Sequence, residues 1–480
     1  MTEHQPATPD PLRWKALALL CLAFFMVILD AQIVILGLPS IEEDLGFSAG
    51  DAQWVMSAYL LSFGGLLLLG GRSADLLGRR RMFMVGTALF LTASLLCGLA
   101  WSGGVLIGAR VLQGISAAIM APTALSILMT TFEEGPERNK ALGIWSAIGG
   151  MGATAALLIG GPLTDALGWE WIFFINVPVA IGLLALGPIL LRESRGEVSG
   201  RTYDLGGAVT VTAALVLLVY AVVEAPDAGW GSVQTIGLLL ASGLLFAVFA
   251  GGESRSASPL VPLRIFRSRT LVGGNLVLAA LGMVAFGMSL IVSMYAQQVL
   301  GYSALEFGLG TTVMTVMAVV GSTAGQAIVT RIGFRPVAAA GLFLTGAGCL
   351  LLTRVSADGS YFGDIFIGLL IFGPGLGAAY VAASVATLAG VVDEESGLAS
   401  ALNNAAFQIG GALGSAVVTT VAISETAGPD PFSALTEGFQ SAFVAAAVFA
   451  ALGVLCAILL LGRRGRPAPL GSRPAAAPTD

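Results

Sequence analysis

Fourteen runs of apolar residues, each about 20 residues long, follow one another along the 480-residue chain. A run of this length is long enough to cross the hydrocarbon core of a bilayer as an α-helix. The runs lie near residues 16–38, 52–70, 82–101, 105–130, 141–163, 170–191, 207–224, 234–252, 271–296, 307–330, 336–353, 362–388, 400–423 and 438–462. Within lipid, every backbone polar group needs an internal partner, which helices provide. The pattern therefore predicts an all-α membrane protein with fourteen transmembrane spans.

The composition supports this prediction and excludes several classes of function. Charged residues make up 11% of the chain and the mean hydropathy is +0.88, whereas soluble domains carry about 25% charged residues. All four cysteines lie inside apolar runs, and the only histidine, His4, lies in the polar N-terminal tail. The sequence has no phosphate-binding glycine loop followed by Lys and Ser or Thr, and no cluster of nucleophile, base or metal ligands. We therefore expect no enzyme activity, no cofactor and no metal, and the scattered basic residues argue against nucleic-acid binding.

The distribution of basic residues predicts the orientation of the chain. The segment from Gly71 to Arg81 joins the second and third spans and holds four arginines. Lys and Arg concentrate in cytoplasmic loops, so this segment is expected to face the cytoplasm. If the spans alternate from a cytoplasmic N-terminus, all basic residues except Arg110 and Arg354 lie on the cytoplasmic side. The charges thus favour an even number of spans with both termini in the cytoplasm.

A weak internal repeat divides the chain into two halves. Residues 330–335 match residues 75–80, with Gly333 on Gly78 and Arg335 on Arg80, an offset that corresponds to eight spans. The expected organisation is two six-helix bundles with two inserted helices between them. Its parts are a cytoplasmic tail (1–15), an N-terminal bundle (16–191), two linker helices (207–252), a C-terminal bundle (271–462) and a second cytoplasmic tail (463–480). Tandem halves with a binding site at their interface are usual in secondary transporters.

Two ionisable residues lie inside the predicted spans. Asp30 is the only acid placed well within a span, where a charge costs about 2.5–3.5 kcal/mol on insertion scales. One interpretation is a structural acid that pairs with a neighbour or caps a broken helix. The other, which we favour, is a proton or cation site, because burial disfavours the charged form. Arg110 stays charged and needs water, a carboxylate or backbone carbonyls. It either holds a helix junction or tunes a nearby acid.

Polar and aromatic residues in or beside the spans are candidates for a substrate cavity. Each one is also compatible with interhelical hydrogen bonding or an interfacial position, but as a set they suit an amphipathic organic substrate better than a bare ion. They are Tyr59, Gln113, Trp145, Asn275, Tyr295, Gln297, Gln298, Tyr380, Asn403, Asn404 and Gln408. The fifth span also carries small residues that favour close helix packing or a bend. These are Gly149, Gly150, Gly152, Gly160 and Gly161, followed by Pro162.

Several motifs together resemble a known family. Gly71-x-Ser73-Ala74-Asp75-x-x-Gly78-Arg79-Arg80-Arg81 is similar to the signature loop of the major facilitator superfamily. The stretch from Leu29 to Val34, ending in Leu38-Pro39, resembles the first-span motif of its fourteen-span drug:proton antiporter branch, and Arg110-x-x-Gln113-Gly114 resembles the fourth-span motif. Gly160-Gly161 with residues 169–178 resembles the fifth-span region, and residues 397–404 with 408–414 resemble the thirteenth. The sequence departs from the pattern at Gln32, Ile35 and Ala156-Leu157.

The resemblance implies a major facilitator fold and a proton-coupled efflux transporter that exports lipophilic drugs or antibiotics by alternating access. It implies that Asp30 is the proton or cation site and Arg110 its coupling partner. Gly71, Asp75, Gly78, Arg79 and Arg80 would form the cytoplasmic gate motif. The expected partners are a small lipophilic substrate, protons and the bilayer of the plasma membrane, with the protein acting as a monomer. The alternatives are an exporter dedicated to one endogenous metabolite or self-made antibiotic, and a non-transporting membrane sensor or scaffold.

Overall fold

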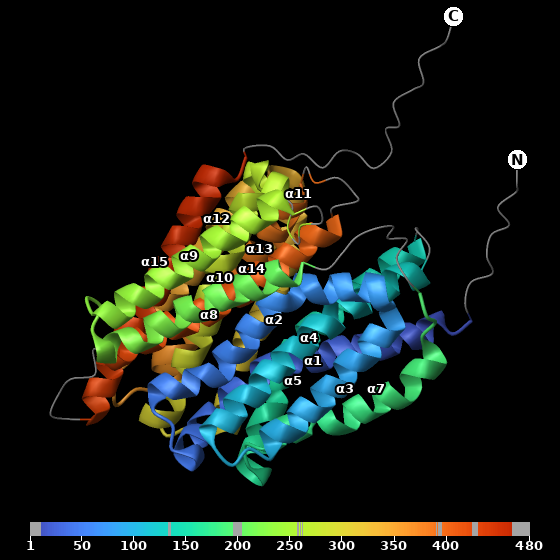
Figure 1. Ribbon diagram of the computed structural model, residues 1–480. Coiled ribbons are helices and arrows are strands. Elements are labelled where there is room, and N and C mark those ends of the chain that lie inside the picture. The colour runs from blue at the N-terminus through green and yellow to red at the C-terminus, as the bar shows by residue number, and fades with distance from the viewer. Residues whose placement is uncertain are drawn as a thin grey trace, which may run out of the picture.

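The computed structural model describes residues 11–132, 136–194, 204–256, 259, 261, 263–389, 391, 396–424 and 431–462. All regular elements in these ranges are helices, and most of them lie side by side along one common direction (Figure 1). Thirteen of the described helical segments are long and apolar enough to cross a membrane. A further helix, α5 (Pro136–Leu167), has 32 residues. The prediction of an all-α membrane protein is confirmed.

The first half of the chain forms a bundle in which α4 packs against both α2 and α3, while α1 packs against α5. Its helices are α1 (Arg13–Leu45), α2 (Ala49–Leu77), α3 (Arg79–Gly98), α4 (Gly103–Thr131), α5, the short α6 (Trp171–Phe174) and α7 (Asn176–Leu190). The first and sixth predicted spans differ from the helices. Hydropathy ends the first span at residue 38, but α1 continues through polar residues until Gly46 caps it at φ +65°. The sixth predicted span is divided at Ile175 into α6 and α7.

The C-terminal two fifths of the chain form a second bundle, in which α10 packs against α14 and α13 packs against both α11 and α12. Its long helices are α10 (Arg269–Met294), α11 (Ala304–Ile332), α12 (Phe334–Leu352), α13 (Phe366–Leu388), α14 (Ser396–Ser424) and α15 (Pro431–Leu460). Short π-helical turns, η2 (Tyr295–Val299) and η3 (Tyr361–Ile365), adjoin α10 and α13.

The same turn occurs once in each bundle, at the two glycines of the sequence repeat. Gly78 ends α2 and begins α3 with φ +109°, and Gly333 ends α11 and begins α12 with φ +88°. Positive φ strongly favours glycine, because a side chain clashes with the backbone there. The repeat at residues 75–80 and 330–335 therefore corresponds to a repeated turn between two long helices.

Between the two bundles lie α8 (Leu205–Ala228), α9 (Val233–Arg255) and the short η1 (Leu263–Arg267). The α8 helix packs against α9 and also against α2 and α14, so it contacts both bundles. Figure 1 shows α8 and α9 as neighbouring helices along one side of the molecule. The inserted pair therefore lies beside the boundary between the two halves.

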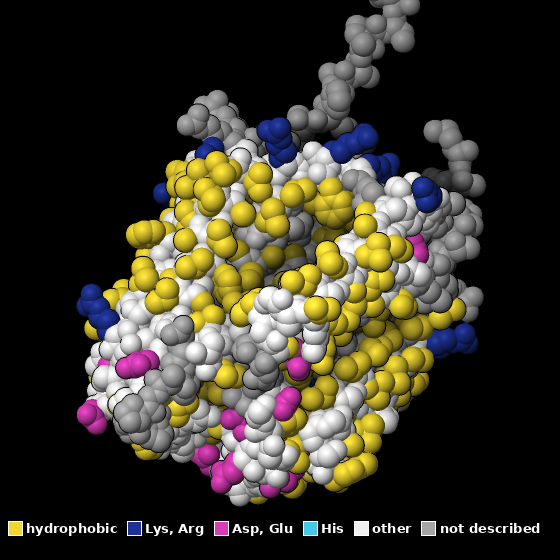
Figure 2. Space-filling model, turned by 60° about the vertical axis from the view of Figure 1, so that its left-hand side comes forward, with side chains coloured by type: hydrophobic (Ala, Val, Ile, Leu, Met, Phe, Trp, Pro, Cys, Tyr) yellow, Lys and Arg dark blue, Asp and Glu magenta, His cyan; other side chains and the backbone are white. Residues whose placement is uncertain are grey.

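Most charged side chains lie toward the two ends of the molecule. Figure 2 shows most of the visible Lys and Arg along the upper rim, with others lower at the left and right sides, and most of the visible Asp and Glu toward the lower end. Between them lies a broad hydrophobic belt, which is hollowed below the rim. Such a belt between two polar ends is what a bilayer requires.

Candidate functional site

The two ionisable residues of the predicted spans form a buried ion pair. Arg110 Nη1 donates to Asp30 Oδ2 at 2.7 Å, and both side chains are 0% exposed. Arg110 Nε donates to the backbone carbonyl of Val55 at 2.8 Å. The guanidinium also lies 4.3 Å from the ring centroid of Tyr59. The arginine therefore joins α1, α2 and α4 at a single point.

Two amide side chains complete the hydrogen bonding of Asp30. Its Oδ1 accepts from Gln113 Nε2 at 2.9 Å and from Asn176 Nδ2 at 2.8 Å. Gln113 also accepts from Arg110 Nη1 at 2.8 Å and contacts Ser94 Oγ at 2.9 Å. Sequence reasoning did not single out Asn176 or Ser94 as site residues. The stretch from 169 to 178 pointed to the region of Asn176, but nothing in the sequence pointed to Ser94.

The cluster surrounds the fully buried Asp30 carboxyl group with hydrogen-bond donors. Three N–H groups donate to Asp30, and donors of this kind favour its charged form. Protonation of Asp30 would remove the attraction to Arg110 and leave an unpaired cation in the protein interior, which is costly. Asp30 thus links α1, α4 and α7 through hydrogen bonds that are strongest when its carboxyl group is charged.

At the end of the molecule where α1 ends and α11 begins, the two bundles are held together. Gln298 Nε2 donates to Glu42 Oε2 at 3.0 Å, and the backbone N–H of Leu305 donates to Asp165 Oδ2 at 3.1 Å. A Cβ placed on Gly161 would lie 2.4 Å from the Cα of Leu305, so α5 and α11 touch backbone to backbone. We call these contacts, from Glu42, Gly161 and Asp165 to Gln298 and Leu305, the outer clamp, because the charge distribution predicts that this end faces the outside.

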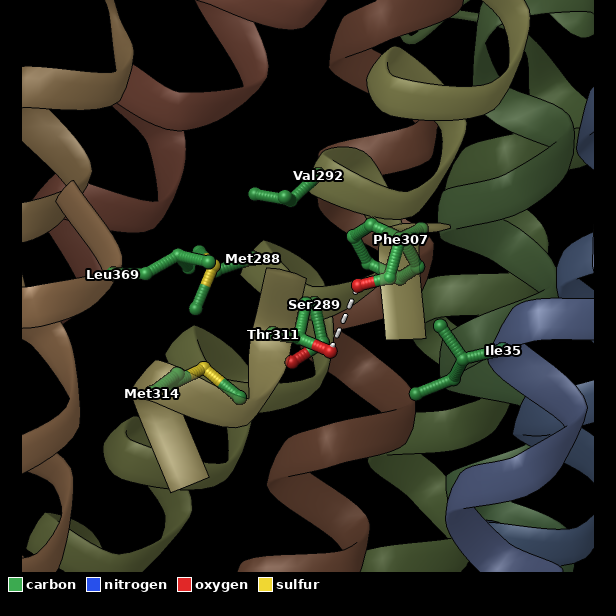
Figure 3. Close-up of a pocket in the computed structure, with 8 residues that line it drawn as sticks. All are labelled: Ile35, Met288, Ser289, Val292, Phe307, Thr311, Met314 and Leu369. Atoms are coloured by element: carbon green, nitrogen blue, oxygen red, sulfur yellow. Dashed lines mark hydrogen bonds between the residues drawn. The ribbon is translucent and has the colours of Figure 1, made fainter. Parts of the chain in front are cut away.

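Two cavities lie near this clamp. One, of about 580 Å³, is lined by acidic and polar residues that include Glu42, Glu43, Asp165 and Gln298. The other measures about 10 Å³ and lies between the bundles (Figure 3). It is lined by Ile35, Met288, Ser289, Val292, Phe307, Thr311, Met314 and Leu369. Its volume admits about one water molecule. The bundles are therefore almost completely packed against each other at this depth.

The residues predicted to line a cavity are spread over several environments. Tyr59 and Gln113 belong to the ion-pair cluster, Trp145 stacks on Phe24 at 4.2 Å, and Tyr380 packs edge-on against Phe407. The remaining contacts are from Tyr295 to Ser356, Gln297 to Ser293, Gln298 to Glu42, Asn275 to Leu271 and Asn404 to Ser400, while Gln408 and Asn403 are buried. The structure does not bring this set together in one pocket.

The glycines of the fifth span pack against two different partners. Gly152 and Gly160 face Ile28 and Ile33 of α1, while Gly161 faces α11 of the other bundle. Pro162 lies inside α5. Gly149 lies in α5, but its surroundings, like those of the Asp75 side chain in α2, fall outside the described residues. Close packing therefore accounts for three of these glycines.

The predicted gate loop is tied to the end of α7. The backbone N–H groups of Arg80 and Arg81 donate to the Glu193 carboxylate at 3.1 and 3.2 Å, and that of Arg79 donates to the carbonyl of Ser194 at 2.9 Å. A carboxylate at the N-terminus of α3 is favoured by the helix dipole. A Cβ on Gly78 would lie 2.7 Å from Glu193 Oε1, so this contact also requires the glycine. Gly71 packs against Pro122 of α4.

A family model described as Major Facilitator Superfamily matches residues 20–296 and 276–479. This chain belongs to the major facilitator superfamily. The predicted family is confirmed, and membership makes the chain a multi-pass membrane transporter, not an enzyme.

This superfamily member is similar to several curated proteins over most of its length. It is 39% identical over 456 residues to a puromycin resistance protein of Streptomyces alboniger, covering 93% of this chain and 90% of that protein. It is 39% identical to a cephamycin export protein of Amycolatopsis lactamdurans, and the match covers 94% of this chain and 93% of that protein. It is 36% identical to a tetracenomycin C resistance and export protein of Streptomyces glaucescens, and the match covers 86% of this chain and 77% of that protein.

Solved structures support the fold of this superfamily member. A bacterial homologue of the human lysosomal transporter Spinster, in an inward-facing and unoccupied conformation, matches with a TM-score of 0.67 at 19% identity. The match covers 96% of this chain and 100% of that one. At this level of identity the likeness concerns the fold alone, and it confirms the predicted major facilitator architecture.

Proposed function

We propose that this protein is a proton-coupled antiporter that exports lipophilic antibiotics or drugs. The observation that carries the proposal is the fully buried Asp30–Arg110 pair, which joins three helices of the N-terminal bundle. Ionisable groups inside a membrane commonly mark proton relays and ion pathways. The related resistance and export proteins support the class of substrate.

In the proposed cycle, Asp30 takes up a proton from the outside while the outer side of the protein is open. Neutral Asp30 releases Arg110, Gln113 and Asn176, and the resulting change in packing favours closure of the outer clamp. Loss of the proton to the cytoplasm restores the ion pair and the high affinity for substrate. Each charge that crosses the membrane contributes about 2.3 kcal/mol per 100 mV of potential.

The direct test is flux in inside-out vesicles with an imposed pH gradient. Uptake of puromycin, a cephamycin and an unrelated lipophilic monocation is measured with and without an uncoupler. We expect gradient-dependent uptake that the uncoupler abolishes. Uptake that is independent of the gradient would contradict proton coupling, and the absence of uptake for every compound would favour the sensor or scaffold.

The same panel separates a multidrug exporter from an exporter dedicated to one compound. The second function has specific support, because a similar protein is named as a cephamycin export protein. Uptake of all the compounds at comparable rates would indicate a multidrug exporter. Uptake of a single compound would indicate the dedicated function.

We also propose that both termini face the cytoplasm in the plasma membrane and that the monomer is the functional unit. In a variant with Cys456 replaced, the remaining cysteines are buried. Single cysteines are then introduced at Gly231, which is exposed between α8 and α9, and at Thr330, which is exposed near the end of α11. In intact cells an impermeant thiol reagent should label Gly231→Cys, and it should label Thr330→Cys only after permeabilisation. The opposite pattern would reverse the orientation.

A further inference from the structure

The segment from Trp169 to Asn176 lies along the C-terminal half of α1 and contacts it at three levels. On α1, Asp30, Gly37 and Asp44 are seven residues apart, so they share one face of the helix, which turns by only about 20° per seven residues. Trp169 Nε1 donates to Asp44 Oδ2 at 3.0 Å. A Cβ on Gly37 would lie 3.7 Å from the Cβ of Trp169. Asn176 Nδ2 donates to Asp30 Oδ1 at 2.8 Å. Both ends of the segment are therefore hydrogen-bonded to the same helix.

The segment makes these contacts from one side. Its backbone is helical on both sides of the break between α6 and α7, where Ile175 has φ −57° and ψ −27°. Trp169, Phe173 and Asn176 follow the spacing i, i+4, i+7 of a single helix face. They are 5%, 0% and 1% exposed, whereas Trp171, on another face, is 45% exposed. The buried face of the segment is therefore the one that meets α1.

Asn176 differs from the other donors to Asp30 in the helix that carries it. Arg110 and Gln113 both belong to α4, so packing of one helix places both of them. Asn176 begins α7, and Phe173, one turn earlier, has its ring centroid 5.7 Å from the guanidinium carbon of Arg110. Among the described residues, Asn176 is thus the one donor to Asp30 whose position does not depend on α4. Its placement depends on the segment and on the bond from Trp169 to α1.

The other ionisable side chains of the cluster keep their protons. The Tyr59 hydroxyl of α2 donates to a backbone carbonyl of α1 at 3.2 Å, and the Cys97 thiol of α3 donates to Gln113 Oε1 at 3.4 Å. A phenol or thiol that donates in this way is neutral. Arg110 is always charged. Among the described residues of the cluster, proton exchange is therefore left to Asp30.

We propose that Asn176 is a positioning residue of the Asp30 site, and that Trp169, through its bond to Asp44, holds Asn176 in place. A hydrogen bond to the charged form of a carboxyl group favours that form. Asn176 therefore helps to set the pH at which Asp30 takes up its proton. The inference rests on the proposed function, in which Asp30 is the proton site, and it adds the segment from 169 to 176 to that site.

Infrared titration of the purified protein tests the role of Asn176 without transport. The C=O stretch of protonated Asp30, identified by its absence in Asp30→Asn, is followed as a function of pH. Asn176→Leu removes the donor at similar volume, so we expect half-protonation at a pH about one to two units higher. Asn176→Gln keeps an amide donor, and its midpoint should lie close to the wild-type value. An unchanged midpoint in Asn176→Leu would overturn the proposal, and Asn176→Ala replaces this variant if it does not fold.

A double-mutant cycle tests whether Trp169 acts through Asn176. Trp169→Phe keeps an aromatic ring but removes the donor to Asp44, so the midpoint should move in the same direction by a smaller amount. Trp171→Phe is the matched control and should leave the midpoint unchanged. Adding Trp169→Phe to Asn176→Leu should cause no further shift, because the group through which Trp169 acts is already missing. Additive shifts, or equal shifts in the two tryptophan variants, would overturn the role of Trp169.

Export in inside-out vesicles separates this inference from the proposed function. Infrared midpoints that shift as expected in a protein without proton-driven export would contradict the proposed function alone. Proton-driven export with the same infrared midpoint in wild type and Asn176→Leu would contradict the positioning role alone.

Discussion

Asp30→Asn is expected to abolish proton-driven export and also to lower the stability of the protein. Asparagine cannot exchange a proton, and it leaves Arg110 fully buried with no counter-charge. Removing one partner of a buried ion pair typically costs about 3–5 kcal/mol. Export in inside-out vesicles and the apparent melting temperature in detergent measure the two effects.

The double variant Asp30→Asn, Arg110→Gln separates a transport role from a structural one. It restores a neutral pair of polar side chains, so we expect most of the lost stability to return. Proton-driven export should stay absent, because the carboxyl group that is proposed to carry the proton is missing. If the double variant exports at the wild-type rate with the wild-type pH dependence, Asp30 and Arg110 have a structural role alone.

Gly161→Ala is expected to prevent full closure of the outer clamp. The added Cβ would lie 2.4 Å from the Cα of Leu305 and 2.6 Å from the carbonyl oxygen of Ala304, and neither backbone atom can rotate away. Overpacking of this kind costs about 1–3 kcal/mol, which shifts the closed-to-open ratio about five- to 150-fold. Export should fall, and a cysteine at Ser289, which lines the small cavity between the bundles, should be labelled faster from outside.

Gly160→Ala is the matched control for this prediction. Its nearest obstacles are the side chains of Ile33 and Leu36 within the same bundle, at 2.7 and 3.1 Å. Side chains can adjust by rotation, so export and labelling should change much less. Equal effects at the two glycines would show that general packing of α5, and not closure between the bundles, is responsible.

The sequence by itself determined the fold class, the approximate positions of the spans and the family. Each span is set by its own length and hydropathy, because lipid selects apolar helices one at a time. The sequence repeat places Gly78 and Gly333 at the same position, which indicated a repeated turn. In the structure both glycines have the positive φ of that turn. Asp30 and Arg110 stood out because charges are rare inside spans.

Only the tertiary structure decided which residues meet. Asp30 and Asn176 lie 146 residues apart in the chain, and their hydrogen bond depends on how α1 and α7 are packed. The same holds for the predicted cavity residues, which share polarity but are distributed over different helix interfaces. Hydropathy specifies which segments are buried in the membrane. The relative rotation of neighbouring helices depends instead on side-chain packing, and this packing decides which polar groups form hydrogen bonds with each other.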